Sequence, residues 1–199
     1  MRVVLVAVAC ILTVPAAAAA QRLSDAAKLI GGAAVGLALH ESAHVVADFA
    51  SGVAPGVKKV TFGPLPFFAI THDPVGPARE FVISSAGFWA QHAVSEFLLT
   101  TRPALRQDDA PLLKGLLAFN VLTSVAYSGA AFARVGPEER DTRGMAVSAD
   151  IAEPVIGATI LAPAVLDTFR YFGVRNRYVV WGSRVAKVGG ALLVVKAMR

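Results

Sequence analysis

The sequence predicts a mainly α-helical protein, a membrane-embedded bundle of about four to five apolar helices with one short β-hairpin. Hydrophobic residues make up 55% of the 199 residues and charged residues only 17%, whereas soluble domains usually have about 45–50% and about 25%. The mean hydropathy is +0.59. Several apolar segments also approach the roughly 20 residues that a helix needs to cross a bilayer. Together these observations favour a chain that lies in lipid.

The first twenty residues have the pattern of a secretory signal peptide. Arg2 gives a short positive region, residues 3–14 are apolar, and an alanine run precedes Gln21, as at a cleavage site. An uncleaved first membrane helix is the alternative. Residues 21–199 are expected to form a single helical domain. We therefore expect an exported, integral membrane protein, with a secreted or periplasmic protein as the alternative.

Five segments carry the predicted helices of this domain. The first, residues 28–50, contains ionisable side chains in an apolar run, and such groups indicate a functional site because they are costly in lipid. The other segments are residues 80–99, 112–135, 145–172 and 178–198. Arg184 and Lys187 make the last segment amphipathic, so we expect it to lie on the membrane surface rather than to span the bilayer.

The segment after the first helix predicts a β-hairpin. Two runs rich in β-branched and aromatic residues, 57–62 and 67–71, flank the sequence Gly63-Pro64-Leu65-Pro66. Turn residues between two such runs are typical of antiparallel strands joined by a tight connection.

The first helix carries the sequence His40-Glu41-Ser42-Ala43-His44, which is an H-E-x-x-H pattern. Residues four apart lie on one face of a helix, so both imidazoles can bind one Zn²⁺ ion. Glu41 can then hold and deprotonate a water molecule at the metal. The pattern predicts a zinc metallopeptidase with Glu41 as the catalytic residue and with His40 and His44 as ligands. The alternative is a membrane protein that retains the motif without catalysis.

Several classes of protein are excluded. Ala47 and Ala50 occupy the positions where the extended motif H-E-x-x-H-x-x-G-x-x-H needs glycine and histidine. Cys10 is the single cysteine, which excludes a disulfide framework and a four-cysteine zinc site. The net charge is +5, but the basic residues are scattered between apolar runs. We therefore expect the lipid bilayer, and not nucleic acid, as a partner.

In the order of its motifs, the chain resembles the site-2 protease family of intramembrane zinc metallopeptidases. The likeness covers roughly residues 28–170, and it begins with H-E-x-x-H and the hairpin. It continues with the segment Ala86-Gly87-Phe88-Trp89-Ala90-Gln91, which is similar to the family's A-G-P-x-x-N, with Phe88 in place of proline and Gln91 in place of asparagine. The resemblance implies a peptide or membrane-protein substrate, presented as a strand beside the hairpin.

The resemblance also implies the third zinc ligand. The family carries it as the aspartate of an L-D-G motif before a late helix, and Asp141, in Asp141-Thr142-Arg143-Gly144, lies in the corresponding region. Asp150 and Glu96 remain alternatives, Asp150 because it lies in an apolar run and Glu96 because soluble zinc peptidases use a glutamate from a later helix. Asp141 could instead pair with Arg140 or Arg143 in a solvated charge cluster. A soluble, secreted helical zinc peptidase is the remaining functional alternative.

Overall fold

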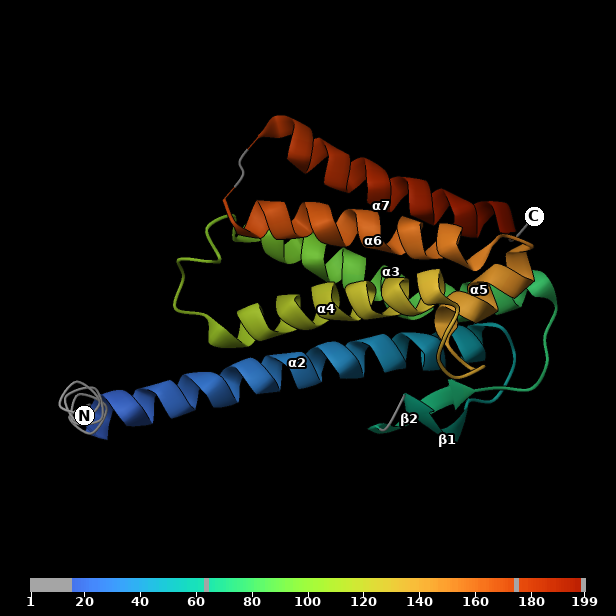
Figure 1. Ribbon diagram of the computed structural model, residues 1–199, viewed down its shortest axis with the longest axis horizontal. Coiled ribbons are helices and arrows are strands. Elements are labelled where there is room, and N and C mark those ends of the chain that lie inside the picture. Colours follow the sequence, from blue (N-terminus) through green and yellow to red (C-terminus); the bar gives the residue numbers. More distant parts are fainter. Residues whose placement is uncertain (1–15, 63–64, 174–175, 198–199) are drawn as a thin grey trace, which may run out of the picture.

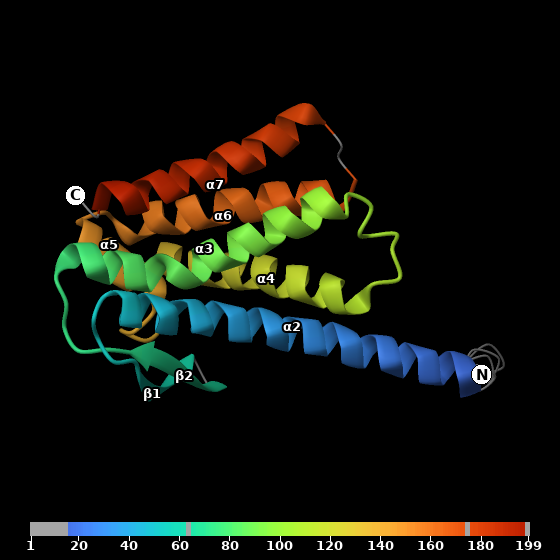
Figure 2. The ribbon, with the colours of Figure 1, turned by 180° about the vertical axis from the view of Figure 1, so that it is seen from behind.

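The computed structural model describes residues 16–62, 65–173 and 176–197. Within them the chain forms six helices and a two-stranded hairpin (Figure 1). The elements in chain order are α2 (Ala16–Ala50), β1 (Gly56–Phe62), β2 (Leu65–Thr71), α3 (Pro77–Thr101), α4 (Pro111–Ala133), α5 (Asp141–Ala149), α6 (Glu153–Tyr171) and α7 (Arg177–Ala197). The long helices run along the long axis of the molecule, and the hairpin and α5 lie at one end (Figure 2). The predicted helical class and the hairpin are confirmed.

The first helix is longer than predicted. It begins at Ala16 instead of residue 28 and continues to Ala50, so it passes through the proposed cleavage point before Gln21 without a break. The predicted signal peptide otherwise falls on residues 1–15, which lie outside the described residues.

The predicted helix over residues 145–172 is two helices. Asp150 ends α5 with a left-handed backbone (φ 53°), and α6 begins at Glu153 with Pro154 in its first turn. A left-handed residue followed closely by a proline cannot continue a helix. Residues 141–144, which lie between the predicted helices 112–135 and 145–172, form the start of α5.

Glycines bring α2 and α4 into close contact. A Cβ atom at Gly32 would lie 1.9 Å from the carbonyl oxygen of Leu112, and one at Gly115 would lie 1.9 Å from that of Leu29. No side chain fits at either position, so the two backbones approach as closely as small residues allow. This contact runs along the half of α2 that precedes the H-E-x-x-H motif.

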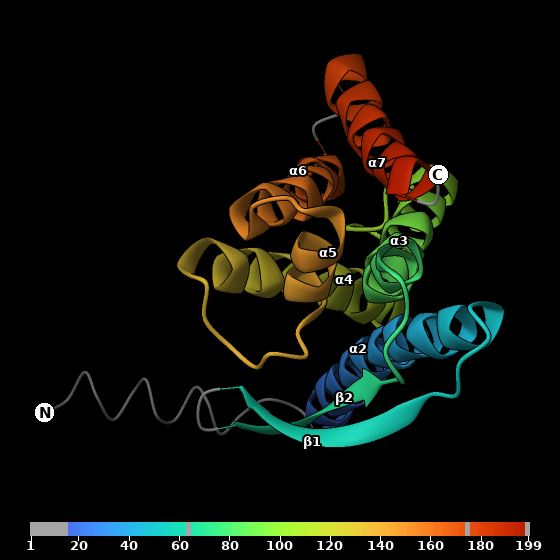
Figure 3. The same cartoon turned by 90° about the vertical axis from the view of Figure 1, so that its right-hand side faces the viewer.

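The hairpin covers the C-terminal part of α2. Its strands are antiparallel, with Gly56 opposite Thr71 and Phe62 opposite Leu65. Figure 3 shows it on the side of α2 that faces away from α6 and α7. An ion pair between Lys58 of β1 and Glu139 joins the hairpin to the loop before α5.

One buried cluster packs α5 against the bundle. It consists of Phe81 and Phe88 of α3, Met145 and Ala146 of α5, and Ile156 and Ile160 of α6. Because α5 is only 9 residues long, too short to be stable alone, its position depends on this cluster and on the polar contacts described below.

In the described chain, α2 and α4 are the two helices that are long and apolar enough to cross a membrane. The expectation of four to five such helices is therefore wrong. The other long helices bury polar side chains against one another, and these lower their hydropathy. Examples are Gln91 and His92 of α3, Asp167 and Arg170 of α6, and Lys187 of α7.

Candidate metal centre

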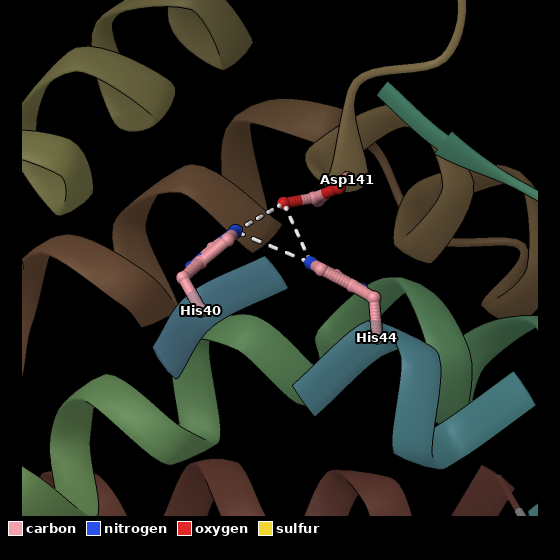
Figure 4. A group of neighbouring side chains, drawn as sticks. All are labelled: His40, His44 and Asp141. Carbon is pink, nitrogen blue, oxygen red and sulfur yellow. Dashed lines mark hydrogen bonds and ion pairs between the residues drawn. The ribbon is translucent and has the colours of Figure 1, made fainter. Parts of the chain in front are cut away.

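Three side chains from two elements converge on one point (Figure 4). Asp141 Oδ2 lies 3.1 Å from His40 Nε2 and 3.4 Å from His44 Nε2, and the two Nε2 atoms lie 3.2 Å apart. These three residues could hold a metal ion, and they are the one such group of histidine, cysteine and acidic residues found in the described chain.

The spacing of the three atoms suits a metal ion between them. Ligand atoms bound tetrahedrally at about 2.0–2.1 Å from a zinc ion lie about 3.4 Å from one another. The observed separations of 3.1–3.4 Å approach this value. The imidazoles and the carboxylate therefore need little movement to bind a common ion.

A backbone carbonyl sets the tautomer of His44. Its Nδ1 lies 2.8 Å from the carbonyl oxygen of Ile83 on α3, and a carbonyl oxygen can only accept a hydrogen bond. Nδ1 therefore carries a proton, and Nε2 is the ring nitrogen that faces Asp141 and that would bind a metal. Metal-binding histidines are commonly oriented in this way.

Glycine makes room for the ring of His40. A Cβ atom at Gly87 of α3 would lie 2.4–2.5 Å from three atoms of this imidazole. The rings of Phe88 and Tyr127 also pack on it, with centroids 5.5 Å and 6.2 Å away. His40 Nδ1 is buried without a hydrogen-bond partner among the described residues, so His40 is held by packing where His44 is held by a hydrogen bond.

A buried ion pair places Asp141 at the site. Arg140 donates from Nε and Nη2 to the two carboxylate oxygens of Glu153, both at 2.7 Å, and Thr142 Oγ1 donates to Glu153 at 2.8 Å. Arg140 also donates to the carbonyl oxygen of Pro137. The residues on either side of Asp141 are thus tied to the first turn of α6, and Asp141 points towards α2.

The surroundings of Asp141 keep it ionised. Burial would raise the pKa of its carboxyl group, but the charge of His44 and hydrogen bonding with His40 and His44 hold that pKa well below its usual range. At neutral pH Asp141 is therefore a carboxylate, which is the form that binds a metal.

A cavity of about 240 Å³ opens onto the site. Glu41, His44 and Asp141 lie in its wall together with Tyr127. The rest of the lining is largely apolar. It comes from α2, the hairpin, α4 and the loop before α5: Leu37, Val60, Phe67, Phe68, Ala69, Ile70, Phe119, Thr123, Ala126, Pro137, Glu139 and Arg140. Glu41 is thus beside the candidate metal position and in contact with a space that a ligand can enter.

The two alternative third ligands lie elsewhere. Asp150 is exposed at the end of α5, and Glu96 pairs with Arg170, Arg184 and Lys187. Neither belongs to the group of His40, His44 and Asp141.

The basic neighbours of Asp141 also have other partners. Arg140 pairs with Glu153, and Arg143 lies 3.5 Å from Glu138. The structure thus brings Asp141 to the two histidines instead of placing it in a surface charge cluster.

Four contributors to the site were not predicted. They are the carbonyl group of Ile83, the ring of Tyr127, the space at Gly87 and the carboxylate of Glu153. The sequence does not indicate which backbone carbonyl group accepts a hydrogen bond from a side chain. Tyr127 cannot be distinguished by sequence from any other aromatic residue of an apolar helix. Gly87 lies in the segment compared with A-G-P-x-x-N, so that comparison pointed to its neighbourhood without indicating its role.

Comparison with known proteins gives no match: no family model, no curated protein and no solved structure matches this chain. The resemblance to site-2 proteases therefore rests on the residues quoted above.

Proposed function

We propose that the protein is a zinc metallopeptidase that hydrolyses peptide bonds within or next to a membrane. The observation that carries the proposal is the convergence of His40, His44 and Asp141 on one point in the wall of a cavity that Glu41 also lines. The site-2 protease-like order of motifs supports the same function.

The donor set favours zinc. Two imidazole nitrogens with one carboxylate oxygen form a usual three-ligand set of catalytic zinc sites, which leave a further position for water or substrate. Carboxylate and water ligands alone would suit Mg²⁺ or Ca²⁺ better. Bound zinc would act as a Lewis acid on the substrate carbonyl and would lower the pKa of a water molecule.

Glu41 is the general base of the proposed reaction. It follows His40 directly on α2 and lies in the cavity wall beside His44 and Asp141. In the proposed reaction its carboxylate accepts a proton from the attacking water and then donates a proton to the leaving amine nitrogen. His40, His44 and Asp141 hold the metal, and none of them needs to exchange a proton.

The cavity suits an extended, apolar peptide segment. Its lining is mostly apolar, and β2 supplies one side of it through Phe67, Phe68, Ala69 and Ile70. A helical substrate shields its carbonyl groups by hydrogen bonding, so a membrane-spanning substrate has to unwind locally before cleavage.

The outward faces of α2 and α4 support a membrane location. In the most apolar windows of these helices only 22% and 39% of residues are buried, whereas a core helix of a soluble protein is mostly buried. Large apolar side chains are exposed along both, including Leu39 and Val46 of α2 and Leu122 and Phe132 of α4. Lipid would cover these side chains.

The test combines metal content with cleavage. Full-length protein purified in detergent is assayed for zinc and for hydrolysis of a pool of apolar fluorogenic peptides. Glu41→Gln should keep the bound zinc and lower the rate by roughly 10²–10⁴-fold, because it removes only the general base. Glu138→Gln, whose side chain is 82% exposed, is the matched control and should change neither quantity.

The outcomes separate this proposal from its rivals. Zinc binding with cleavage that Glu41→Gln leaves unchanged would show that Glu41 is not the base. A protein without bound zinc would instead point to the non-catalytic alternative, in which His40, His44 and Asp141 form a metal-free ionic network.

A further inference from the structure

Helix α7 has the opposite polarity from that of a helix on a water-facing surface. Such a helix turns its apolar side to the protein and its charged side to water. In α7, Ser183 and Lys187 are buried against the bundle, whereas Trp181, Val185 and Leu192 are exposed. At 3.6 residues per turn these two sets lie on opposite sides of the helix.

The buried side of α7 belongs to an ionic network with α3 and α6. Lys187 Nζ lies 2.8 Å from both Glu96 and Asp167, and Ser183 Oγ donates to Asp167 at 2.6 Å. Arg170 pairs with Glu96 as well. Arg184, whose side chain is 38% exposed, also pairs with Glu96. Every basic group in this network thus has a carboxylate partner within the protein.

The outer side of α7 is a continuous apolar stripe. Its members are exposed by 59–70%, and they are Tyr178, Trp181, Val185, Val188 and Leu192. On the neighbouring helix α6, Val165 and Phe169 are also exposed. Large apolar side chains are thus exposed on both helices.

We propose that the outer stripe of α7 lies against lipid acyl chains, so that α7 is embedded in the bilayer rather than lying on its surface. This inference rests on the membrane location in the proposed function but not on zinc or catalysis. On a water-facing helix the cations would be exposed and the stripe buried, whereas in α7 Lys187 is buried, Arg184 is only partly exposed and the stripe is exposed. In lipid the same arrangement covers the stripe and keeps the charges paired within the protein.

The dimensions and ends of α7 agree with this position. Its 21 residues extend about 31 Å at 1.5 Å per residue, close to the thickness of about 30 Å of a bilayer hydrocarbon core. Tyr178 and Trp181 lie near its N-terminal end beside Arg177, and aromatic and basic residues are typical of the membrane–water interface.

A second copy of the chain is the competing occupant of the stripe. The stripe residues recur at alternating intervals of three and four, which also suits a partner helix. The length of α7 and the aromatic and basic residues near its N-terminal end favour lipid, because these features match a bilayer core and its interface.

The two tryptophans of the chain provide the test. Trp181 is 62% exposed on the stripe, whereas Trp89 packs at the α3–α7 interface, where a Cβ atom at Gly190 would lie 2.2 Å from its ring. Trp89→Phe and Trp181→Phe therefore each leave one reporter. Both full-length variants are reconstituted into phosphatidylcholine vesicles with or without brominated acyl chains, and tryptophan fluorescence is compared.

Brominated lipid should quench Trp181 severalfold more strongly than Trp89, and should quench Trp181 more strongly than aqueous iodide does. Quenching of Trp181 by iodide and not by brominated lipid would overturn the proposal, because the stripe would then face water. Protection of Trp181 from both quenchers would also overturn it, in favour of a second copy. If Trp89→Phe does not fold, the difference between wild type and Trp181→Phe reports the same quantity.

The quenching result is independent of the proposed activity. A Glu41→Gln background should give the same quenching, so loss of peptidase function and loss of the lipid contact are distinguished.

Discussion

At the scale of single residues, the candidate metal centre depends on how each ligand is oriented. His44 is oriented by the Ile83 carbonyl, His40 by the packing of Gly87 and two aromatic rings, and Asp141 by the contacts of its chain neighbours. The three ligand atoms are therefore positioned before any metal binds. This lowers the free-energy cost of ordering them when a metal binds.

The first prediction concerns Asp141 itself. Asp141→Ala removes one of three ligands and should lower zinc affinity by at least about tenfold, the effect seen when even groups behind the ligands are removed. Metal analysis of purified protein across a range of free zinc measures this affinity. Asp150→Asn is the matched control, because Asp150 is exposed at the other end of α5 and asparagine tolerates its left-handed backbone. Equal losses in both variants would contradict the assignment of Asp141.

The second prediction concerns the space beside His40. Gly87→Ala would place a methyl group 2.4–2.5 Å from the imidazole of His40, so this ring must move. The three ligand atoms would then no longer be positioned to bind one ion. We expect lower zinc content in a protein that is still folded. Gly31→Ala serves as the control, since a Cβ atom there meets nothing within 4 Å. Zinc binding by Gly87→Ala at the wild-type level would show that His40 tolerates the shift.

At the scale of elements, two contacts decide whether the site forms. The pair of α2 and α4 supports the H-E-x-x-H helix through Gly32 and Gly115. The bridge from Arg140 to Glu153 supports the start of α5, which carries Asp141. Each contact lies outside the site, yet each positions a different part of it.

The third prediction concerns the α5–α6 bridge. Glu153→Gln removes the charge that Arg140 pairs with and leaves a guanidinium buried without its partner. Breaking a buried pair in this way costs about 3 kcal/mol of unfolding free energy, and Asp141 should also bind zinc less tightly. Thermal denaturation and zinc titration measure the two effects. Glu138→Gln removes an exposed carboxylate nearby and should leave both unchanged.

The same bridge predicts a dependence of stability on pH. Burial would raise the pKa of Glu153, but hydrogen bonds from Arg140 and Thr142 lower it below its ordinary value. Its contribution to stability is therefore complete above the ordinary pKa of about 4.3 and is lost as the pH falls through the lowered pKa. Wild type should lose more stability than Glu153→Gln on acidification from pH 6. Parallel losses in the two proteins would contradict this role of Glu153.

The fourth prediction concerns the α2–α4 contact. Gly32→Ala would place a Cβ atom 1.9 Å from the carbonyl oxygen of Leu112, and the helices must separate to admit it. Overpacking of this kind typically costs about 1–3 kcal/mol of unfolding free energy. Gly31→Ala, one position earlier and facing open space, should be neutral or stabilising. Similar unfolding free energies of both variants would show that α2 and α4 can separate at little cost and would contradict the prediction.

At the scale of the whole molecule, apolar side chains cover much of the outside while charged groups pair inside. Exposed large apolar residues occur on α2, α4, α6 and α7, among them Phe49, Val125, Phe169 and Val185. Soluble proteins rarely expose apolar surface on so many elements at once. A bilayer provides the solvent for which this distribution is favourable.

The fifth prediction follows from that distribution. The expressed protein should stay in the membrane fraction after an alkaline carbonate wash and should need detergent for extraction. Release by carbonate would contradict membrane embedding and would favour a soluble, secreted peptidase. Because zinc content is measured separately, this result would not decide whether the site binds metal.

The sequence by itself determined the features that depend on local spacing. The five residues from His40 to His44 place two imidazoles on one helix face, since that follows from 3.6 residues per turn. The hairpin over Val57–Thr71 follows from two β-prone runs around a turn. The composition also predicted the helical class, although it overestimated the number of helices that resemble membrane spans.

Tertiary structure alone decided the features that depend on distant segments. Asp141 lies 101 residues after His40, and the packing of α5 on α3 and α6 brings it within 3.1 Å of that imidazole. Packing likewise decides that Lys187 faces Glu96 and Asp167 instead of water. The physical reason is that periodicity defines the faces of a helix but not which face meets a neighbour. That choice depends on contacts between residues far apart in the chain.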